Sequence, residues 1–117
     1  MDDDKITEFF IKLTTTLAKN CYDKMFKGCT SLSSAPDLPA TTLMNYCYRE
    51  MFRGDTKLNS LRVGFSAFTG TGSTADWLFG TSATGTFYCP TALGTNETIT
   101  RGASNCPAGW TVVNTGA

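Results

Sequence analysis

The stretch TTLMNYCYREMFRGDTKLNSLRVGF, Thr41–Phe65, decides the predicted fold because the chain contains a second version of it. Moved by 26 residues, it aligns with Thr15–Pro39, TTLAKNCYDKMFKGCTSLSSAPDLP. The shared residues include Leu17/Leu43, Cys21/Cys47, Tyr22/Tyr48, Met25/Met51, Phe26/Phe52, Gly28/Gly54, Thr30/Thr56, Leu32/Leu58 and Ser34/Ser60. A period of about 20–50 residues is typical of a solenoid, in which each repeat buries its apolar face against its neighbours. The repeat indicates an architecture and names no reaction.

Each copy divides into a helical part and an extended part. In Leu17–Gly28, apolar residues recur at i, i+4 and i+8 while lysines lie between them, which predicts an amphipathic helix ended by Gly28. Leu32–Pro39 and the equivalent Leu58–Val63 follow as short extended segments, and the prolines of the first keep it irregular. We therefore expect an α/β solenoid whose rungs of about 26 residues each hold one short strand and one short helix.

The second half of the chain contains a third, less regular copy of the repeat, which we expect to end the stack. Asp76–Gly80 falls 26 residues after Glu50–Gly54, at the end of the helical part, whereas a Gly/Thr loop, Phe68–Thr74, stands where that helix would begin. Thr86–Cys89 is the next strand. Gly109–Val113 reads as a terminal strand. Residues 6–117 thus form one domain, with regular repeats over 6–64 and a degenerate repeat and β-rich C-terminal cap over 65–117.

The beginning of the chain leaves two alternatives open. Ile6–Leu13 has the spacing of an amphipathic helix, whereas the repeat register favours the strand of an earlier rung. Met1–Lys5 is interpreted as the remnant of an added expression sequence, so a missing signal peptide says little about localisation. The rung at Ile6–Leu17 has no polar cap, so we expect a second copy of the chain, as a homodimer, or further repeats to cover it.

The repeat resembles the BspA-like, or Treponema pallidum-type, leucine-rich repeats of bacterial surface proteins. The residues that carry the resemblance are Leu32, Leu38, Pro39, Leu43, Met51, Phe52 and Leu58, with Cys29 in the cysteine position. The ending RGASNCPAGWTVV is similar to that of gut Bacteroides members of the group. Asp55 stands where the pattern expects cysteine, and the repeat is about three residues longer than the commonest form. The resemblance covers roughly Ile6–Phe87 and implies a leucine-rich repeat stack, export to the cell surface, and adhesion to host or bacterial proteins.

Composition argues against several classes of function. The net charge is zero, which gives no electrostatic footprint for nucleic acid, and no apolar run approaches the roughly 20 residues that span a bilayer. The chain contains no histidine, so histidine-activated nucleophiles and the commonest metal ligand are absent. We expect no cofactor, no metal and no enzyme activity.

The five cysteines are expected to behave in two ways. Cys21 and Cys47 lie on the repeated apolar face and are predicted to be free, buried thiols. Cys89 and Cys106 follow strand-to-loop transitions in the cap, and a disulfide between them would stabilise an exported domain by roughly 3 kcal/mol.

The candidate binding residues are those that stacked strands would place in rows on the open face of the sheet. They are Ser34 with Ser60, and Pro36 with Arg62 and Tyr88, with Phe10 continuing the second row. Such continuous surfaces bind proteins or glycans in other solenoids. The alternatives are a structural spacer or capping fragment of a longer repeat protein with no ligand, and an enzyme, which the missing histidine disfavours.

Overall fold

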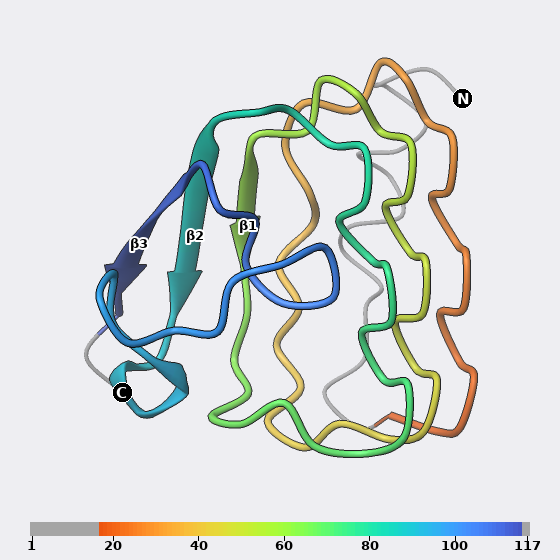
Figure 1. The fold of residues 1–117 in the computed structure, drawn as a ribbon. Helices are drawn as coiled ribbons and strands as arrows, with labels where there is room; N and C mark the ends of the chain where they lie inside the picture. The colour runs from red at the N-terminus through yellow and green to blue at the C-terminus, as the bar shows by residue number, and fades with distance from the viewer. Residues whose placement is uncertain (1–16, 116–117) are drawn as a thin grey trace.

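The computed structural model describes residues 17–115, and its regular elements are strands rather than helices (Figure 1). The strands are β1 (Ser60–Arg62), β2 (Gly85–Cys89) and β3 (Trp110–Asn114), and η1 (Thr91–Leu93) is one turn of 3-10 helix. They form one parallel sheet in the order β1-β2-β3. The two strands expected over 86–89 and 109–113 are present as β2 and β3.

The prediction of an α/β solenoid with helix-and-strand rungs is wrong. The described residues contain no α-helix, and they form a small compact body of 34 × 30 × 23 Å around the three-stranded sheet. The segments expected to be helical, 17–28, 43–54 and 76–80, consist of consecutive turns. The expected strand over 32–39 contributes one isolated bridge, Leu38 to Val63. Predictions for Met1–Lys5, Ile6–Leu13 and the N-terminal dimer surface concern residues that lie mostly outside the described range.

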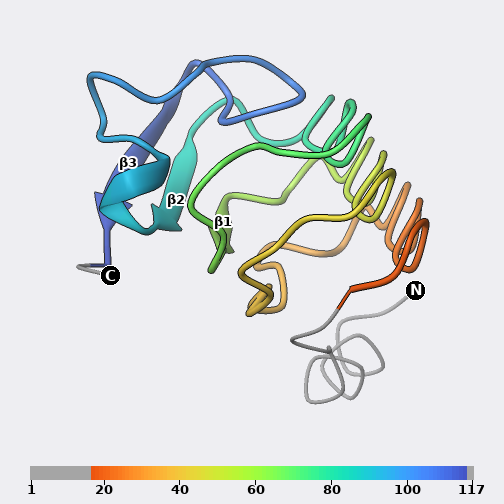
Figure 2. The ribbon, with the colours of Figure 1, turned by 90° about the horizontal axis from the view of Figure 1, so that it is seen from below.

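Three of the turn segments, 18–28, 44–54 and 70–80, lie side by side on the side of the molecule away from the sheet (Figures 1 and 2). We call them the turn ladder. Every second N–H bonds to the carbonyl three residues back, as from Met25 to Tyr22 at 3.2 Å. In the first two segments the alternate N–H groups bond to the next segment, as from Phe26 to the Met51 carbonyl at 2.9 Å. This alternation pairs the backbone donors that a helix would have paired internally.

Backbone dihedrals explain why these segments are not helices. A positive φ recurs at every fourth residue, at Asn20, Lys24 and Gly28 in the first segment and at Tyr46, Glu50 and Gly54 in the second. A right-handed helix requires negative φ throughout, so each of these residues interrupts one. A four-residue turn unit still returns every fourth side chain to the same face, and it therefore satisfies the apolar spacing that suggested a helix.

The hydrophobic core lies between the turn ladder and the sheet (Figure 2). Aromatic rings stack from one ladder segment to the next, with 6.0 Å between the ring centroids of Tyr22 and Tyr48 and 5.9 Å between Phe26 and Phe52. Trp77 is completely buried and its ring contacts the Phe87 ring of β2, 6.2 Å away. These contacts join ladder and sheet through one continuous core.

The C-terminal loop, residues 96–106, closes both the ladder and the sheet. Its carbonyls accept from the third ladder segment, from the Leu78 N–H at 3.0 Å and the Trp77 indole at 2.8 Å. Arg101 donates to the Trp110 carbonyl at 2.6 Å, and the Asn96 side chain accepts from the Val112 N–H at 2.9 Å. Both contacts cover outward-facing backbone groups of β3, which protects part of an edge that would otherwise be free to pair.

Candidate functional site

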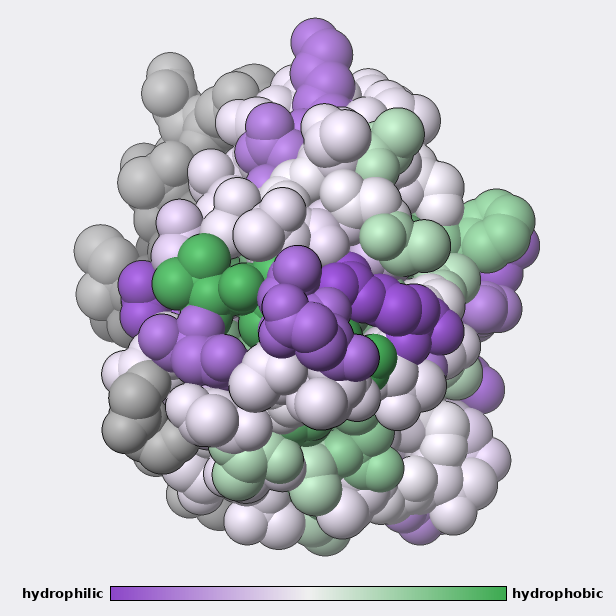
Figure 3. All heavy atoms as spheres, turned by 60° about the vertical axis from the view of Figure 1, so that its left-hand side comes forward, coloured by the Kyte–Doolittle hydropathy of each residue, from purple (hydrophilic) through white to green (hydrophobic). Residues whose placement is uncertain are grey.

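The outer face of the sheet carries two rows of side chains across the three strands. The parallel register sets Ser60 opposite Thr86 and Thr86 opposite Thr111, which makes a row of hydroxyls. Two residues further along each strand, the register sets Arg62 opposite Tyr88 and Tyr88 opposite Val113. Leu61, Phe87 and Val112, between the rows, are buried on the core side, as period-two alternation requires. Figure 3 shows the side of the molecule on which the strands lie, with hydrophilic and hydrophobic atoms adjacent across its middle.

The second row contains a preformed cation–aromatic pair. The Arg62 guanidinium lies over the Tyr88 ring, 4.7 Å from its centroid, which is within the range of an attractive cation–π contact. Arg62 is exposed and Tyr88 is half-buried, so the pair is accessible from solvent. Val113 beside them is 41% exposed. The row thus offers charge, aromatic surface and apolar surface within three adjacent strands.

A shallow notch of about 140 Å³ opens next to Arg62. It is lined by residues 37–39 and 62–64, which belong to β1, its continuation and the chain segment beside it. That segment is held in place by backbone hydrogen bonds from Ala35 to the Ser60 carbonyl and from Leu38 to the Arg62 carbonyl, both 2.9 Å. The notch is a concave feature beside Arg62, at the end of the second row.

The structure brings together most of the candidate residues that the sequence indicated. Ser60, Arg62 and Tyr88 lie on neighbouring strands, and the exposed Ser34 lies beside Ser60 because the residues on either side of it bond to Asn59 and Ser60. Pro36 is a correction, because it is buried and takes no part in the exposed row. Phe10 lies outside the described residues.

Sequence reasoning missed Thr86, Thr111 and Val113. The apolar–polar–apolar order of Trp110, Thr111 and Val112 was the available signal, because period-two alternation then turns Thr111 and Val113 to the opposite face. Without a register between β2 and β3, however, these residues could not be placed beside Tyr88.

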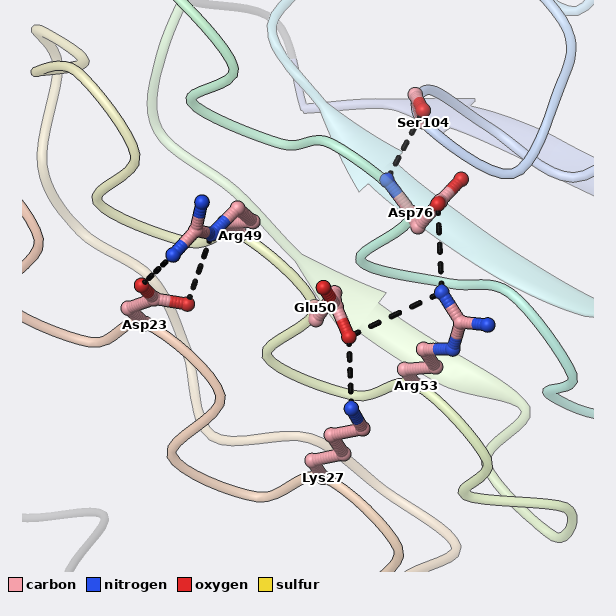
Figure 4. Close-up of polar contacts among 7 residues, drawn as sticks. All are labelled: Asp23, Lys27, Arg49, Glu50, Arg53, Asp76 and Ser104. Carbon is pink, nitrogen blue, oxygen red and sulfur yellow. Dashed lines mark hydrogen bonds and ion pairs between the residues drawn. The ribbon is translucent and has the colours of Figure 1, made fainter.

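A second polar surface runs across the turn ladder, but its charges pair with one another (Figure 4). Arg49 contacts Asp23 at 2.6 Å, and Lys27 contacts Glu50 at 2.8 Å. Arg53 lies 3.8 Å from Glu50 and 3.4 Å from Asp76. The Arg49 hydrogen bond lowers the pKa of Asp23, and the Lys27 hydrogen bond lowers the pKa of Glu50. This surface joins the three ladder segments and has little net charge to attract an ionic ligand.

The thiols show no arrangement suited to catalysis or metal binding. Cys29, Cys47, Cys89 and Cys106 are buried, and burial raises the pKa of each, that of Cys106 to about 11. Thiolates would therefore be rare at neutral pH. Within residues 17–115 no group of three or more histidine, cysteine or acidic residues is placed to hold a metal ion.

The expected disulfide between Cys89 and Cys106 is not present in this structure. Both thiols are free and donate weakly to different carbonyls, Cys89 to Gly94 and Cys106 to Pro107, each at 3.7 Å. Cys21 and Cys47 are also free, but Cys21 is exposed rather than buried as predicted. Its segment is the first in the described part of the ladder, so Cys21 has a described neighbour on one side only.

Comparison with protein-family models, with curated proteins and with solved structures finds no match to this chain. In the part of the chain that the structure describes, no helix has the length and apolar character needed to cross a membrane.

Proposed function

We propose that this protein is a non-enzymatic binding module that recognises a protein or a glycan through the outer face of its parallel sheet. The observation that supports this most directly is the row Arg62, Tyr88 and Val113, which presents a cation–aromatic pair and an exposed aliphatic residue on a rigid support. Aromatic residues and arginine are the residue types that most often dominate binding energy at interfaces. Val113 adds exposed apolar surface next to this pair.

The site of action that we propose is the bacterial cell surface or its surroundings. The resemblance of the repeated stretch to BspA-like surface proteins supports this, as does the high threonine and glycine content of a chain with zero net charge. The hydroxyl row of Ser60, Thr86 and Thr111 adds donors and acceptors beside the aromatic pair. Such a combination suits the alternating apolar and polar faces of a sugar, or the rim of a protein epitope.

Screening against a glycan array and a panel of extracellular-matrix proteins tests the proposal, with Arg62→Ala and Tyr88→Ala as the variants. Each should weaken binding of any ligand found by at least about tenfold, which corresponds to about 1.4 kcal/mol. The matched control is Tyr46→Ala on the turn ladder, where Arg49 lies 4.9 Å from the ring centroid in a similar cation–π pair. Equal loss in variant and control would show that the sheet face is not the site. An absence of any ligand would favour a purely structural spacer.

A further inference from the structure

A hollow of about 360 Å³ lies at the end of the turn ladder, beside the residues that lead into β2 and β3. Residues 78–83 of the third ladder segment and its continuation line one side, and Gly102, Ala103 and residues 107–109 line the other. All of these residues are uncharged, and most of them are small. The hollow therefore presents mainly backbone and short side chains.

The hydrogen-bond pattern of the ladder identifies a backbone donor beside this hollow that has no partner in the described part of the chain. In the first segment the Gly28 N–H donates to the Arg53 carbonyl, and in the second the Gly54 N–H donates to the Phe79 carbonyl, both at 2.8 Å. In the third segment the Leu78 N–H still finds a partner in Ala103. The equivalent Gly80 N–H has no hydrogen-bond partner among residues 17–115. Among the described residues the Gly72, Thr74 and Gly80 N–H groups all lack the intersegment hydrogen bond that their equivalents make, and of these three residues Gly80 lines the hollow.

The side chain next to this donor is also incompletely covered. Phe79 is 51% exposed, the most exposed aromatic residue in the described core and surface. One side of its ring is covered by the Arg53 guanidinium of the preceding segment, 4.7 Å from the ring centroid. Arg53 thus packs on Phe79, its equivalent in the third segment. No described ladder segment follows the third, so no equivalent residue covers the other side of the Phe79 ring.

We propose that the hollow binds a main-chain segment of a partner protein in the way that one ladder segment binds the next. A carbonyl oxygen of the partner accepts a hydrogen bond from the Gly80 N–H, and an apolar side chain packs on the exposed part of Phe79. The lining has no charged side chain to neutralise a strongly ionic ligand, which disfavours such a ligand. A peptide fits better than a small molecule because the equivalent N–H groups, those of Gly28 and Gly54, both donate to backbone carbonyls.

Amide hydrogen exchange tests the open donor directly. The Gly80 amide should exchange at least about tenfold faster than those of Gly28 and Gly54 in the free protein, because those two are hydrogen-bonded. Equal protection of all three amides would show that the donor is already paired and would overturn the proposal.

Binding is tested by NMR titration with two capped peptides that copy residues 44–54 and 70–80, and with a displayed library of random 12-residue peptides. We expect saturable shifts centred on Gly80, Phe79 and Ala103 for at least one of these probes. Ala108→Trp, which fills the hollow from an exposed position, should weaken binding at least tenfold, whereas Ala92→Trp on η1 should not. If Ala108→Trp does not fold, Ala83→Leu replaces it on the opposite wall.

Three results would overturn the proposal. The first is that no probe shifts the Gly80 amide at millimolar concentration, and the second is that Ala108→Trp binds as well as Ala92→Trp. The third is that glycans, and no peptide, produce the shifts at Gly80. Tyr88→Ala should leave peptide binding unchanged, so the outcome here is independent of the outcome for the sheet face.

Discussion

Asp55 is a carboxylic acid that lies in the protein interior, an environment unfavourable for its charged form. It is fully buried, at the position that Cys29 occupies 26 residues earlier. One carboxylate oxygen accepts from the Cys29 N–H at 2.7 Å, and the other has no partner in the described part of the chain. Burial raises the pKa of Asp55 to about 7, although the hydrogen bond from the Cys29 N–H and the nearby Gly28 backbone lower it in part. The carboxylate is therefore close to its protonation midpoint at neutral pH.

Asp55 should make the protein less stable as pH rises. Below about pH 4 the carboxyl is protonated in both the folded and unfolded states, so its burial carries no charge penalty. Between that pH and about 7 only the folded state keeps the proton, so the free energy of unfolding falls by up to about 4 kcal/mol. Urea denaturation at pH 5 and pH 8 should therefore show a smaller difference in Asp55→Asn than in the native protein.

The Asp55→Asn variant is needed as a reference because other carboxylates change the free energy of unfolding in the opposite direction as pH rises. The lowered pKa values of Asp23 and Glu50 mean that their contributions to stability are lost as pH falls. An identical pH dependence in Asp55→Asn and the native protein would contradict the prediction.

Tyr48 carries a second buried polar group without a partner. Its ring is stacked between Tyr22 and Trp77, and its hydroxyl finds no hydrogen bond within the described residues. Tyr48→Phe removes the desolvated hydroxyl and keeps the ring, so the free energy of unfolding should rise by about 1 kcal/mol. Thermal unfolding measures this, and Tyr88→Phe on the half-exposed sheet face is the control. A loss of stability in Tyr48→Phe would show that the hydroxyl is hydrogen-bonded after all.

At the scale of elements, the turn ladder explains both the success and the failure of sequence reasoning. The apolar residues Cys47 and Met51 are buried, as the repeat predicted, because their spacing of four places them on one face. A helix and a four-residue turn unit share that spacing over a short segment, so the pattern alone could not separate them. The recurring glycines Gly28, Gly54 and Gly80 all have positive φ, but the same is true of Lys24, Tyr46 and Glu50, which carry no such signal.

Lys24 should be a site at which the ladder can be made more stable. Its φ of 61° lies in the left-handed region, which is unfavourable for a long side chain and more acceptable for asparagine, as at Asn20. Lys24→Asn should raise the free energy of unfolding by about 0.5–1 kcal/mol, measured by urea denaturation in moderate salt to screen the lost charge. The control is Lys19→Asn, an exposed neighbour without a positive φ. A similar change in both variants would mean that charge, and not backbone strain, is responsible.

For the whole molecule, the sequence predicted the positions of the strands better than the architecture that surrounds them. Phe87 and Trp110 lie buried on β2 and β3, the two strands that were expected, and Gly85 provides the space that the Trp110 indole fills. An added Cβ at Gly85 would lie 2.6 Å from the indole, a constraint that only the packed structure reveals. The sheet-face residues Ser60, Arg62 and Tyr88 could be proposed from the repeat. The hollow beside Gly80 could not, because it depends on how the C-terminal loop packs against the turn ladder.

Thiol labelling should report the global unfolding of this single core. Only Cys21 among the five cysteines is exposed, so a thiol reagent should modify one site in the native protein and all five in denaturant. The four buried thiols should react together, at a rate set by unfolding, because ladder, sheet and C-terminal loop share one core. Mass spectrometry after timed labelling distinguishes this from early reaction of Cys89 and Cys106, which would indicate that the C-terminal part opens separately.

The alternation of hydrogen bonds in the turn ladder also restricts how the chain can change in length. A single inserted residue within a segment would exchange the N–H groups that point to the neighbouring segment with those that close local turns. Two inserted residues would restore that direction but would displace the positive-φ positions, which recur every four residues. Insertions and deletions should therefore be tolerated only in multiples of four, and in all three segments together, whereas the loops between them are free to vary by one residue at a time.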